Sequence, residues 1–338
     1  MTAESTPQVD LFLLAGLFPG AGHAGTLRAA ADYAVAAERA GFGGVWLAEH
    51  HFGEYGVCPS AVTLAAHLLG RTARLRVGTA AAILPNRHPV ALAEEAALLD
   101  AVSGGRFDLG VARGGPWVDL EVFGTGPRRY DHAGFAAALD LLLAAVSGAA
   151  VLSGDGDGDG FRFRDVAMVP RPARPLPVWV AATGTPTVEL AAARNLPLLL
   201  GMHDDDAAKA AMLRHHAASG GTTAGHVSAH LAFVADSVAE AESALRRAMP
   251  GWLRAAQATV RIDGSPPPRR DPAAYLDHLL ATHPVGPPQR CARRLRATLA
   301  ATGVRRLLLM VEGGGDPRRT LANINRLGRE VLPALRAP

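Results

Sequence analysis

The stretch VWLAEHH, residues 45–51, decides the fold, because an apolar strand ends directly in polar side chains. Two further apolar segments follow it, at residues 75–84 and 106–113, and each also ends in small or polar residues. A segment of helical character follows each of the three. In a parallel α/β barrel the active site lies on the loops after the strands. This part of the chain therefore predicts such a barrel, with the Glu-His-His sequence at its mouth.

The same strand-and-helix unit recurs along the chain. Its apolar runs are continuous, which indicates strands buried on both faces and therefore paired in parallel. We expect strands at 9–15, 44–48, 75–84, 107–112, 178–181, 196–201, 226–234 and 305–311. Helices are expected at 26–40, 60–70, 89–102, 132–147, 188–194, 204–219, 238–248, 289–301 and 317–335. Thr26 is the expected N-cap of the first helix and Gly41 its C-terminal stop.

The number of strands, and the absence of a break in composition, predict one α/β domain over residues 1–338. Its architecture is a (β/α)8 TIM barrel with insertions rather than two doubly wound domains. The first insertion, 148–170, contains an Asp-x-Asp-x-Asp-Gly pattern, but Val166 stands where a calcium loop needs a bidentate Glu, so we expect a flexible acidic turn. The second, 250–288, is Pro-rich, and we expect it to be irregular and lid-like.

Composition excludes several classes of function. The chain has 338 residues and a net charge of +3, yet Lys209 is its only lysine, the arginines are scattered and aromatic residues make up 5%. A nucleic-acid surface combines clustered basic residues with aromatic ones, so we expect no nucleic-acid partner. No uncharged apolar run reaches the ~18 residues of a membrane span, and no signal peptide is apparent, which predicts a cytoplasmic protein without a membrane partner. Cys58 and Cys291 are too few for a disulfide framework.

The two adjacent histidines suggest acid–base chemistry. Neighbouring side chains on an extended backbone point to opposite sides, so only one of His50 and His51 is expected to face the barrel mouth. This disfavours a metal pair, and the other histidines lack the spacing of a third ligand, so we expect no metal. Imidazole titrates near neutral pH and needs a partner to fix its tautomer. Glu49 is adjacent and is the predicted partner, so Glu49, His50 and His51 are the predicted catalytic residues.

Three weaker signals point to a phosphorylated ring cofactor. Residues 77–82 end in tiny side chains, which let a flat ring approach the backbone. Arg113 and Gly114 place a guanidinium beside a glycine turn, which suits a phosphate. The turn 183–187 adds hydroxyls and backbone N–H groups at a helix N-terminus. Each signal also has an ordinary explanation as a helix cap or a turn, and no dinucleotide fingerprint, Walker sequence, HExxH or GxSxG motif is present.

Taken in order, these motifs resemble the bacterial luciferase-like flavin monooxygenase family, and the likeness is closest to the catalytic luciferase subunit. The matching residues are 45–52, 65–70, 77–81, 84–85, 88–90, 98–100, 103–107 and 113–114, with looser similarity over 178–197 and 286–312. The resemblance implies a (β/α)8 barrel, in agreement with the number of strands. It also implies a homodimer formed through the helices at 60–70 and 89–102.

The resemblance further implies FMN as cofactor, delivered as FMNH2 by a separate flavin reductase, with O2 as co-substrate. The flavin ring would lie against Ala80 and Ala81, where the family has a non-prolyl cis peptide. The residues implied in phosphate binding are Arg113, Gly114, Thr183, Gly184, Thr185 and Thr187. Oxygen would add at the flavin C4a position, and the resulting (hydro)peroxide would oxygenate a small organic substrate, such as one of specialised metabolism.

His50 matches the family's catalytic histidine, His51 and His88 match supporting positions, and we expect His88 and Trp117 to contact substrate. Two positions depart from the catalytic luciferase subunit: Ala112 replaces a reactive cysteine and Thr183 an acidic residue. They argue against light emission from a long-chain aldehyde. Two alternatives stay open, a deazaflavin-dependent oxidoreductase on the same barrel and a non-catalytic flavin-binding partner subunit. The second is disfavoured because both His50 and Arg113 are present.

Overall fold

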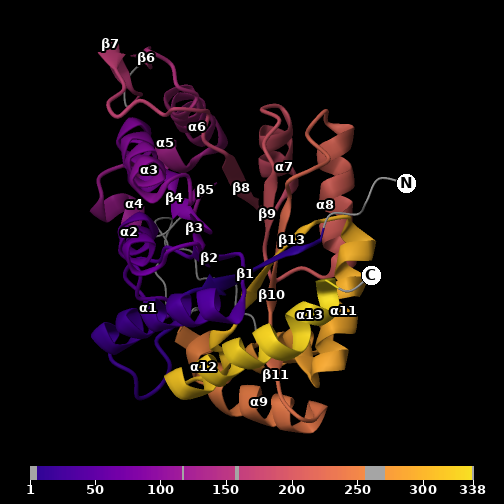
Figure 1. The fold of residues 1–338 in the computed structure, drawn as a ribbon. Helices are drawn as coiled ribbons and strands as arrows, with labels where there is room; N and C mark the ends of the chain where they lie inside the picture. Colours follow the sequence, from indigo (N-terminus) through magenta and orange to yellow (C-terminus); the bar gives the residue numbers. More distant parts are fainter. Residues whose placement is uncertain (1–5, 116–117, 157–159, 256–270, 337–338) are drawn as a thin grey trace.

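The computed structural model describes residues 6–115, 118–156, 160–255 and 271–336, and within them parallel strands form a closed barrel (Figure 1). The barrel strands are β1 (Gln8–Leu13), β2 (Gly44–Leu47), β3 (Arg76–Thr79), β4 (Ala82–Ile83), β5 (Phe107–Ala112), β8 (Val178–Ala182), β9 (Leu198–Leu200), β10 (Val227–Leu231) and β13 (Arg306–Met310). The ring closes because β1 pairs with both β2 and β13, and β3 with both β2 and β5. β3 and β4 share one position, so the predicted (β/α)8 barrel is confirmed.

Helices cover the outside of the barrel. They are α1 (His23–Ala40), α2 (Ala61–Arg71), α3 (Pro89–Ser103), α4 (Val118–Val122), α5 (Gly126–Tyr130), α6 (His132–Val146), α7 (Thr185–Ala192), α8 (Asp206–Ala218), α9 (Val238–Ala255), α10 (Pro272–Thr282), α11 (Pro288–Thr302), α12 (Pro317–Arg326) and α13 (Leu332–Arg336). Short turns are η1 (Leu84–Asn86), η2 (Glu312–Gly314) and the π-helical η3 (Leu327–Val331). In the described part of the chain, no helix is both long and apolar enough to cross a membrane.

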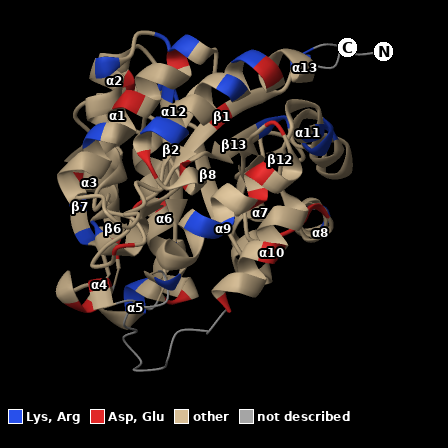
Figure 2. Cartoon of the chain, turned by 90° about the horizontal axis from the view of Figure 1, so that it is seen from below, with Lys and Arg blue, Asp and Glu red and all other residues tan. Residues whose placement is uncertain are grey.

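Smaller sheets lie outside the barrel. β6 (Val151–Asp155) and β7 (Arg162–Ala167) form an antiparallel hairpin at one edge of the molecule (Figure 1). β11 (Phe233–Val234) and β12 (Val285–Gly286) form a short parallel pair. Basic and acidic residues are interspersed along α1 and the C-terminal helices (Figure 2). Two aspartates of the suspected calcium pattern, Asp157 and Asp159, lie outside the described residues.

Several predicted boundaries were wrong. The predicted strand 226–234 is divided into β10 and β11, which lie in different sheets, and the predicted helix 188–194 begins at Thr185. α1 begins at His23, with Gly22 rather than Thr26 as its N-cap, whereas Gly41 ends it with a φ of 85° as predicted. An N-cap preference is worth only about 1 kcal/mol, and here Thr26 N donates to Gly22 O at 2.9 Å, which places Thr26 inside an exposed first turn. The predicted strand 75–84 breaks after Thr79, where the Ala80–Ala81 peptide bond is cis.

The predicted irregular region 250–288 is helical over much of its described length. α9 continues to Ala255 with Pro250 inside it, and α10 occupies 272–282, while 256–270 lies outside the described residues. A proline inside a helix usually costs about 3 kcal/mol or more. The helix continues here because Met249, Trp252 and Leu253 are buried on its inner face.

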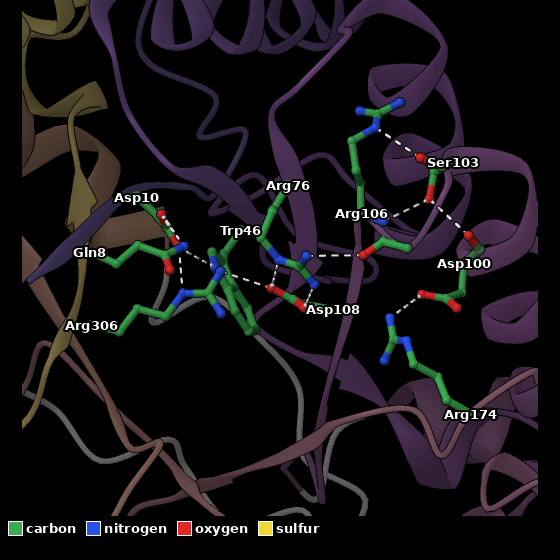
Figure 3. Close-up of polar contacts among 11 residues, drawn as sticks. Gln8, Asp10, Trp46, Arg76, Asp100, Ser103, Arg106, Asp108, Arg174 and Arg306 are labelled. Carbon is green, nitrogen blue, oxygen red and sulfur yellow. Dashed lines mark hydrogen bonds and ion pairs between the residues drawn. The ribbon is translucent and has the colours of Figure 1, made fainter. Parts of the chain in front are cut away.

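A network of charged side chains fills the interior at the N-terminal end of the strands (Figure 3). Asp10 on β1 accepts hydrogen bonds from Trp46 Nε1 at 2.9 Å and from Arg306 Nε at 2.6 Å. Arg306 Nη2 also donates to Asp108 on β5 at 2.8 Å, and Arg76 on β3 pairs with the same carboxylate. The two aspartates are almost completely buried. The network therefore connects five strands, β1, β2, β3, β5 and β13, across the barrel.

The aromatic layer beside this network depends on a glycine. The Arg306 guanidinium lies 4.7 Å from the centre of the Trp46 ring, and Trp46 contacts Trp179 edge to face at 5.3 Å. A Cβ added at Gly78 would lie 2.8 Å from the Trp46 ring, too close for any side chain. Gly78 therefore lets the indole lie across the barrel, and the interior is closed at this end.

We predict that Arg306→Met destabilises the fold strongly. Loss of the guanidinium leaves two buried carboxylates short of a partner, which typically costs about 3–5 kcal/mol of unfolding free energy. The matched control is Arg329→Met, since Arg329 is exposed and, among the described residues, pairs with Glu330 at the surface; it should change stability by less than about 1 kcal/mol. Denaturant unfolding of both variants checks this, and equal losses would show that the buried network is not the cause.

Candidate active site

The carboxyl ends of the strands bring the predicted groups to one end of the barrel. Leu47 is in register with Thr79, and Ile83 with Ala112, so the ends of β2, β3, β4 and β5 lie side by side. Val111 of β5 pairs with Val180 of β8. The Glu-His-His sequence, the cis peptide bond, Arg113 and the turn before α7 therefore meet at the barrel mouth, whereas the opposite end is closed.

Glu49 is a buried anchor rather than a group that faces substrate. Its carboxylate accepts hydrogen bonds from the backbone N–H groups of Ala61 and Ile83, each at 3.1 Å, and from Arg87 at 2.8 Å. Burial by itself would raise its pKa, but the hydrogen bond from His51 and the charge of Arg87 outweigh it, so the pKa of Glu49 is lowered. An ionised carboxylate thus joins the end of β2 to α2 and to β4.

The rings of the two histidines contact different residues. The ring of His51 lies 3.4 Å from Glu49 and contacts Phe123 edge to face at 5.1 Å. The ring of His50 instead contacts Tyr55 edge to face at 5.0 Å. The prediction that Glu49 fixes the tautomer of His50 was therefore wrong, because the carboxylate hydrogen-bonds to His51.

His50 is held tightly at one edge of its ring. Its Nδ1 is buried and has no hydrogen-bond partner among the described residues. A Cβ added at Gly56 would lie 2.4 Å from this nitrogen, so only glycine fits there. Burial lowers the pKa of His50 to about 4, against a smaller opposing effect of Glu49. His50 is consequently neutral around pH 7, and the expectation that it titrates near neutral pH was wrong.

The cis peptide bond is flanked by small side chains. The Ala80–Ala81 bond is cis, as the family resemblance implied, and Ala80 N–H donates to Leu47 O at 2.7 Å. The partly exposed residues that pack on the inner cluster of the barrel mark its lining: Phe12, Tyr55, Ala80, Ala112, Ala181 and Tyr275. Three of them are alanines, so backbone is accessible on this side of the mouth.

Arg113 and the N-terminus of α7 offer partners for an anion on neighbouring strands. The Arg113 guanidinium lies 4.3 Å from the centre of the Tyr130 ring, and its only hydrogen bond to a described residue goes to Tyr130 O at 3.3 Å. Gly114 follows with a φ of 74°. α7 begins after Gly184, and no side chain caps its first turn. Thr183 and Thr185 are exposed there, whereas Thr187 is buried. These donors fit a phosphate group.

Of the two residues predicted to contact substrate, the structure describes His88. His88 is exposed at the start of α3, where its Nδ1 accepts a hydrogen bond from Val90 N at 3.2 Å. Its ring contacts Phe161 of the β6–β7 hairpin, edge to face at 4.9 Å. Trp117 lies outside the described residues. Contact of either residue with substrate stays a prediction.

Sequence reasoning missed several residues at the mouth. Phe52, with a φ of 53°, is 58% exposed and lies 5.8 Å from the exposed ring of Phe123. Glu312, directly after β13, is buried and accepts a hydrogen bond from Leu14 N at 2.7 Å; burial raises its pKa to about 7. An acidic residue after the last strand was a usable signal for Glu312. Exposure of the two phenylalanines cannot be read from local sequence.

The donor set suits a flavin better than a metal. Across the described ranges, no group of three or more histidine, cysteine or acidic side chains is placed to hold a metal ion. The small, partly exposed side chain of Ala80 beside the cis peptide bond, and the candidate anion partners at Arg113 and α7, match a flat ring that carries a phosphate. Nδ1 of His50 is buried against Gly56 and has no hydrogen-bond partner among the described residues. We therefore take Nε2 as the nitrogen that a ligand can reach.

Solved structures share this architecture. The monooxygenase RslO1 from Streptomyces bottropensis superposes with a TM-score of 0.83 at 21% identity, over 96% of this chain and 99% of that one. The oxygenating constituent of 3,6-diketocamphane monooxygenase from Pseudomonas putida, in complex with FMN, gives 0.76 at 19% identity, over 97% and 98%. An F420-dependent secondary alcohol dehydrogenase also gives 0.76, at 16% identity, over 98% and 100%.

Sequence comparison decides the family. The alkanal monooxygenase alpha chain of the Kryptophanaron alfredi symbiont is 28% identical, over 89% of this chain and 90% of its own length. The alpha chain of Photobacterium leiognathi is 27% identical, over 95% and 96%. The family model for luciferase-like monooxygenases matches residues 8–306, nearly the whole barrel. The chain belongs to the luciferase-like monooxygenase family.

Proposed function

We propose that this protein is an FMNH2-dependent, two-component monooxygenase that transfers one oxygen atom from O2 to a small organic substrate. One observation carries the proposal: the cis peptide bond at Ala80–Ala81, the Arg113 guanidinium, the uncapped α7 and the neutral His50 meet at one end of the barrel. FMNH2 is supplied by a separate flavin reductase. The curated relatives, which are alkanal monooxygenases, support this reaction class over the alternatives.

Different residues are expected to bind the ring and the phosphate of the cofactor. Ala80 and Ala81 would hold the flavin ring. Arg113, Gly114 and the first turn of α7, whose N-terminal partial positive charge favours an anion, would hold its phosphate. When bound, the reduced flavin supplies the two electrons needed to activate O2. The protein contributes orientation, exclusion of water and a proton at a defined place.

His50 is the residue that donates or accepts the proton. Its imidazole is neutral at neutral pH, so it is available both to donate an N–H and to accept a proton. Nε2 carries this role because Nδ1 is enclosed by Gly56. Glu49 and His51 support the site from behind, through the hydrogen bonds that hold the end of β2.

The substrate is expected to have an apolar part. Phe52, Val122 and Phe123 expose apolar side chains beside His51, and the two phenylalanine rings are 5.8 Å apart. An exposed cluster of aromatic side chains at a barrel mouth is unusual unless it meets a ligand or a covering segment. We include His88 and Trp117 among the substrate-side residues as predicted from sequence.

Oxygen incorporation tests the function. The protein is supplied with a flavin reductase, NADH, FMN and ¹⁸O₂, and a panel of small substrates is screened for products that gain one ¹⁸O atom. A deazaflavin-dependent oxidoreductase, which the F420-dependent structural neighbour makes the second candidate, would instead transfer hydride with reduced F420 and incorporate no oxygen. A partner subunit without catalytic activity would bind flavin and turn over no substrate in either assay.

We also propose that the protein is a homodimer formed through α2 and α3. Leu98 and Val102 on α3 are 50% and 71% exposed, which leaves an apolar strip without cover. Light scattering at micromolar concentration should give twice the mass of one chain, and Val102→Glu should give a single chain. Val166→Glu, on the hairpin, is the control and should leave the mass unchanged. A wild-type protein with the mass of one chain would rule out the dimer.

Arg113→Ala should weaken FMN binding by about 2–3 kcal/mol, or roughly a hundredfold, because a charge-assisted contact to the phosphate is lost. Titration of apoprotein with FMN, followed by flavin fluorescence, measures the change. His50→Ala is the comparison and should bind FMN almost as well as the wild type. Unchanged affinity in the arginine variant would place the phosphate elsewhere.

His50→Ala should keep FMN affinity and fold while turnover falls by about 100- to 10,000-fold, the usual effect of an acid–base group. With a pKa near 4, His50 stays neutral down to mildly acid pH, so the wild-type rate should fall only as pH approaches about 4. NMR of the imidazole against pH checks this value directly. An inflection near pH 6.5 would contradict the buried environment.

The lowered pKa of His50 also makes the stability of the fold depend on pH. The unfolded chain binds a proton at His50 near pH 6.5 but the folded chain only near pH 4, so stability is lost as pH falls through this window. His51→Ala serves as the partner variant and should lower stability, because Glu49 loses a hydrogen-bond donor. Near-normal turnover in His50→Ala, with turnover abolished in a folded His51→Ala, would reverse the two roles.

A further inference from the structure

The short helix α5 lies between the candidate phosphate site and the β6–β7 hairpin. It has five residues, none of them buried, and no side chain caps its first turn. A helix this short has no stability of its own, so its orientation depends on what it touches. It packs on α4 and α6 at its ends. Two of its side chains, those of Arg129 and Tyr130, connect it to the hairpin and to the candidate site.

Tyr130 makes the contact toward the site. The Arg113 guanidinium stacks on its ring at 4.3 Å and donates to its backbone carbonyl at 3.3 Å. These are the interactions that orient Arg113 in the described structure. The direction in which the guanidinium points is therefore set by α5 rather than by β5, from which Arg113 emerges.

Arg129 makes the contact toward the hairpin. Its guanidinium lies 4.8 Å from the centre of the Phe161 ring, within the range of a cation–π interaction. The other edge of Phe161 meets the ring of His88 at 4.9 Å, and His88 is fixed by its hydrogen bond at the N-terminus of α3. Burial, and then the charge of Arg129, lower the pKa of His88, consistent with a neutral ring in this stack.

We propose that Phe161 and Arg129 are positioning residues for the phosphate-binding Arg113, so that the β6–β7 hairpin acts on cofactor affinity without touching the cofactor. The inference rests on the proposed function, because it takes Arg113 as the phosphate partner. Loss of the Phe161 ring frees Arg129, lets α5 shift, and leaves Tyr130 unable to hold the guanidinium in one direction. The effect falls on the phosphate of the flavin and spares its ring.

Oxidised FMN and riboflavin are the probes, because they differ only in the phosphate. Dissociation constants of both are measured by flavin fluorescence for the wild type, Arg113→Ala, Phe161→Ala, Phe161→Leu and the double variant. Phe161→Ala and Phe161→Leu should weaken FMN about 5- to 10-fold, the size of one cation–π contact, and leave riboflavin unchanged. In the Arg113→Ala background, Phe161→Ala should have no further effect on FMN. Val151→Ala, in the same hairpin, is the matched control and should change neither ligand.

The outcomes separate this inference from the function on which it rests. If Arg113→Ala weakens FMN and riboflavin equally, the assigned phosphate site is wrong. If Arg113→Ala is selective for FMN and neither Phe161 variant is, the hairpin has no positioning role and the inference is overturned. An FMN loss that persists when Phe161→Ala is added to Arg113→Ala would mean a direct route through Arg129, which also overturns it. Phe161→Leu keeps a side chain of similar bulk and decides the matter if Phe161→Ala does not fold.

Discussion

The structure depends on the pairing of Arg306 with Asp10 and Asp108 inside the barrel. Charges in a barrel interior are tolerated only when each has a partner, because removing an ion from water costs several kcal/mol. Here one guanidinium joins two carboxylates from β1 and β5, and Arg76 supports the second. The stack of Arg306 on Trp46 then closes the space above them. The network thus occupies the barrel interior at the N-terminal ends of these strands, away from the candidate active site.

At the carboxyl ends of the strands, the buried carboxylate of Glu49 connects several segments of the chain. A single buried carboxylate pairs with two backbone N–H groups, an arginine and a histidine, which lie at positions 61, 83, 87 and 51 of the chain. The arrangement holds the Ala80–Ala81 backbone in place and leaves His50 on the opposite side of β2, where burial keeps it neutral. In the function we propose, this carboxylate fixes the backbone on the cofactor side, and the uncharged imidazole of His50 is available to donate or accept a proton. A shared fold does not choose between FMN and F420 chemistry, which is decided by such local groups.

The parts of the protein that the sequence determined are those governed by local pattern. Continuous apolar runs predicted the parallel strands, and Gly41 predicted the end of α1, because burial on both faces and a left-handed backbone each demand particular residues nearby. Alternation along a strand predicted that His50 and His51 diverge. The motif string also identified the family, and with it the cis bond at Ala80–Ala81.

Tertiary structure decided everything that depends on which groups meet. Nothing near Glu49 in sequence shows that Arg87 and the N–H of Ile83 would reach it, or that His51 rather than His50 would be its partner. The pKa of His50 follows from burial against Tyr55 and Gly56, and the continuation of α9 through Pro250 follows from the burial of Trp252. The contact of Arg129 with Phe161 joins residues 32 positions apart. Periodicity and caps act over a few residues, whereas desolvation and ion pairing depend on distances in space that only the folded chain defines.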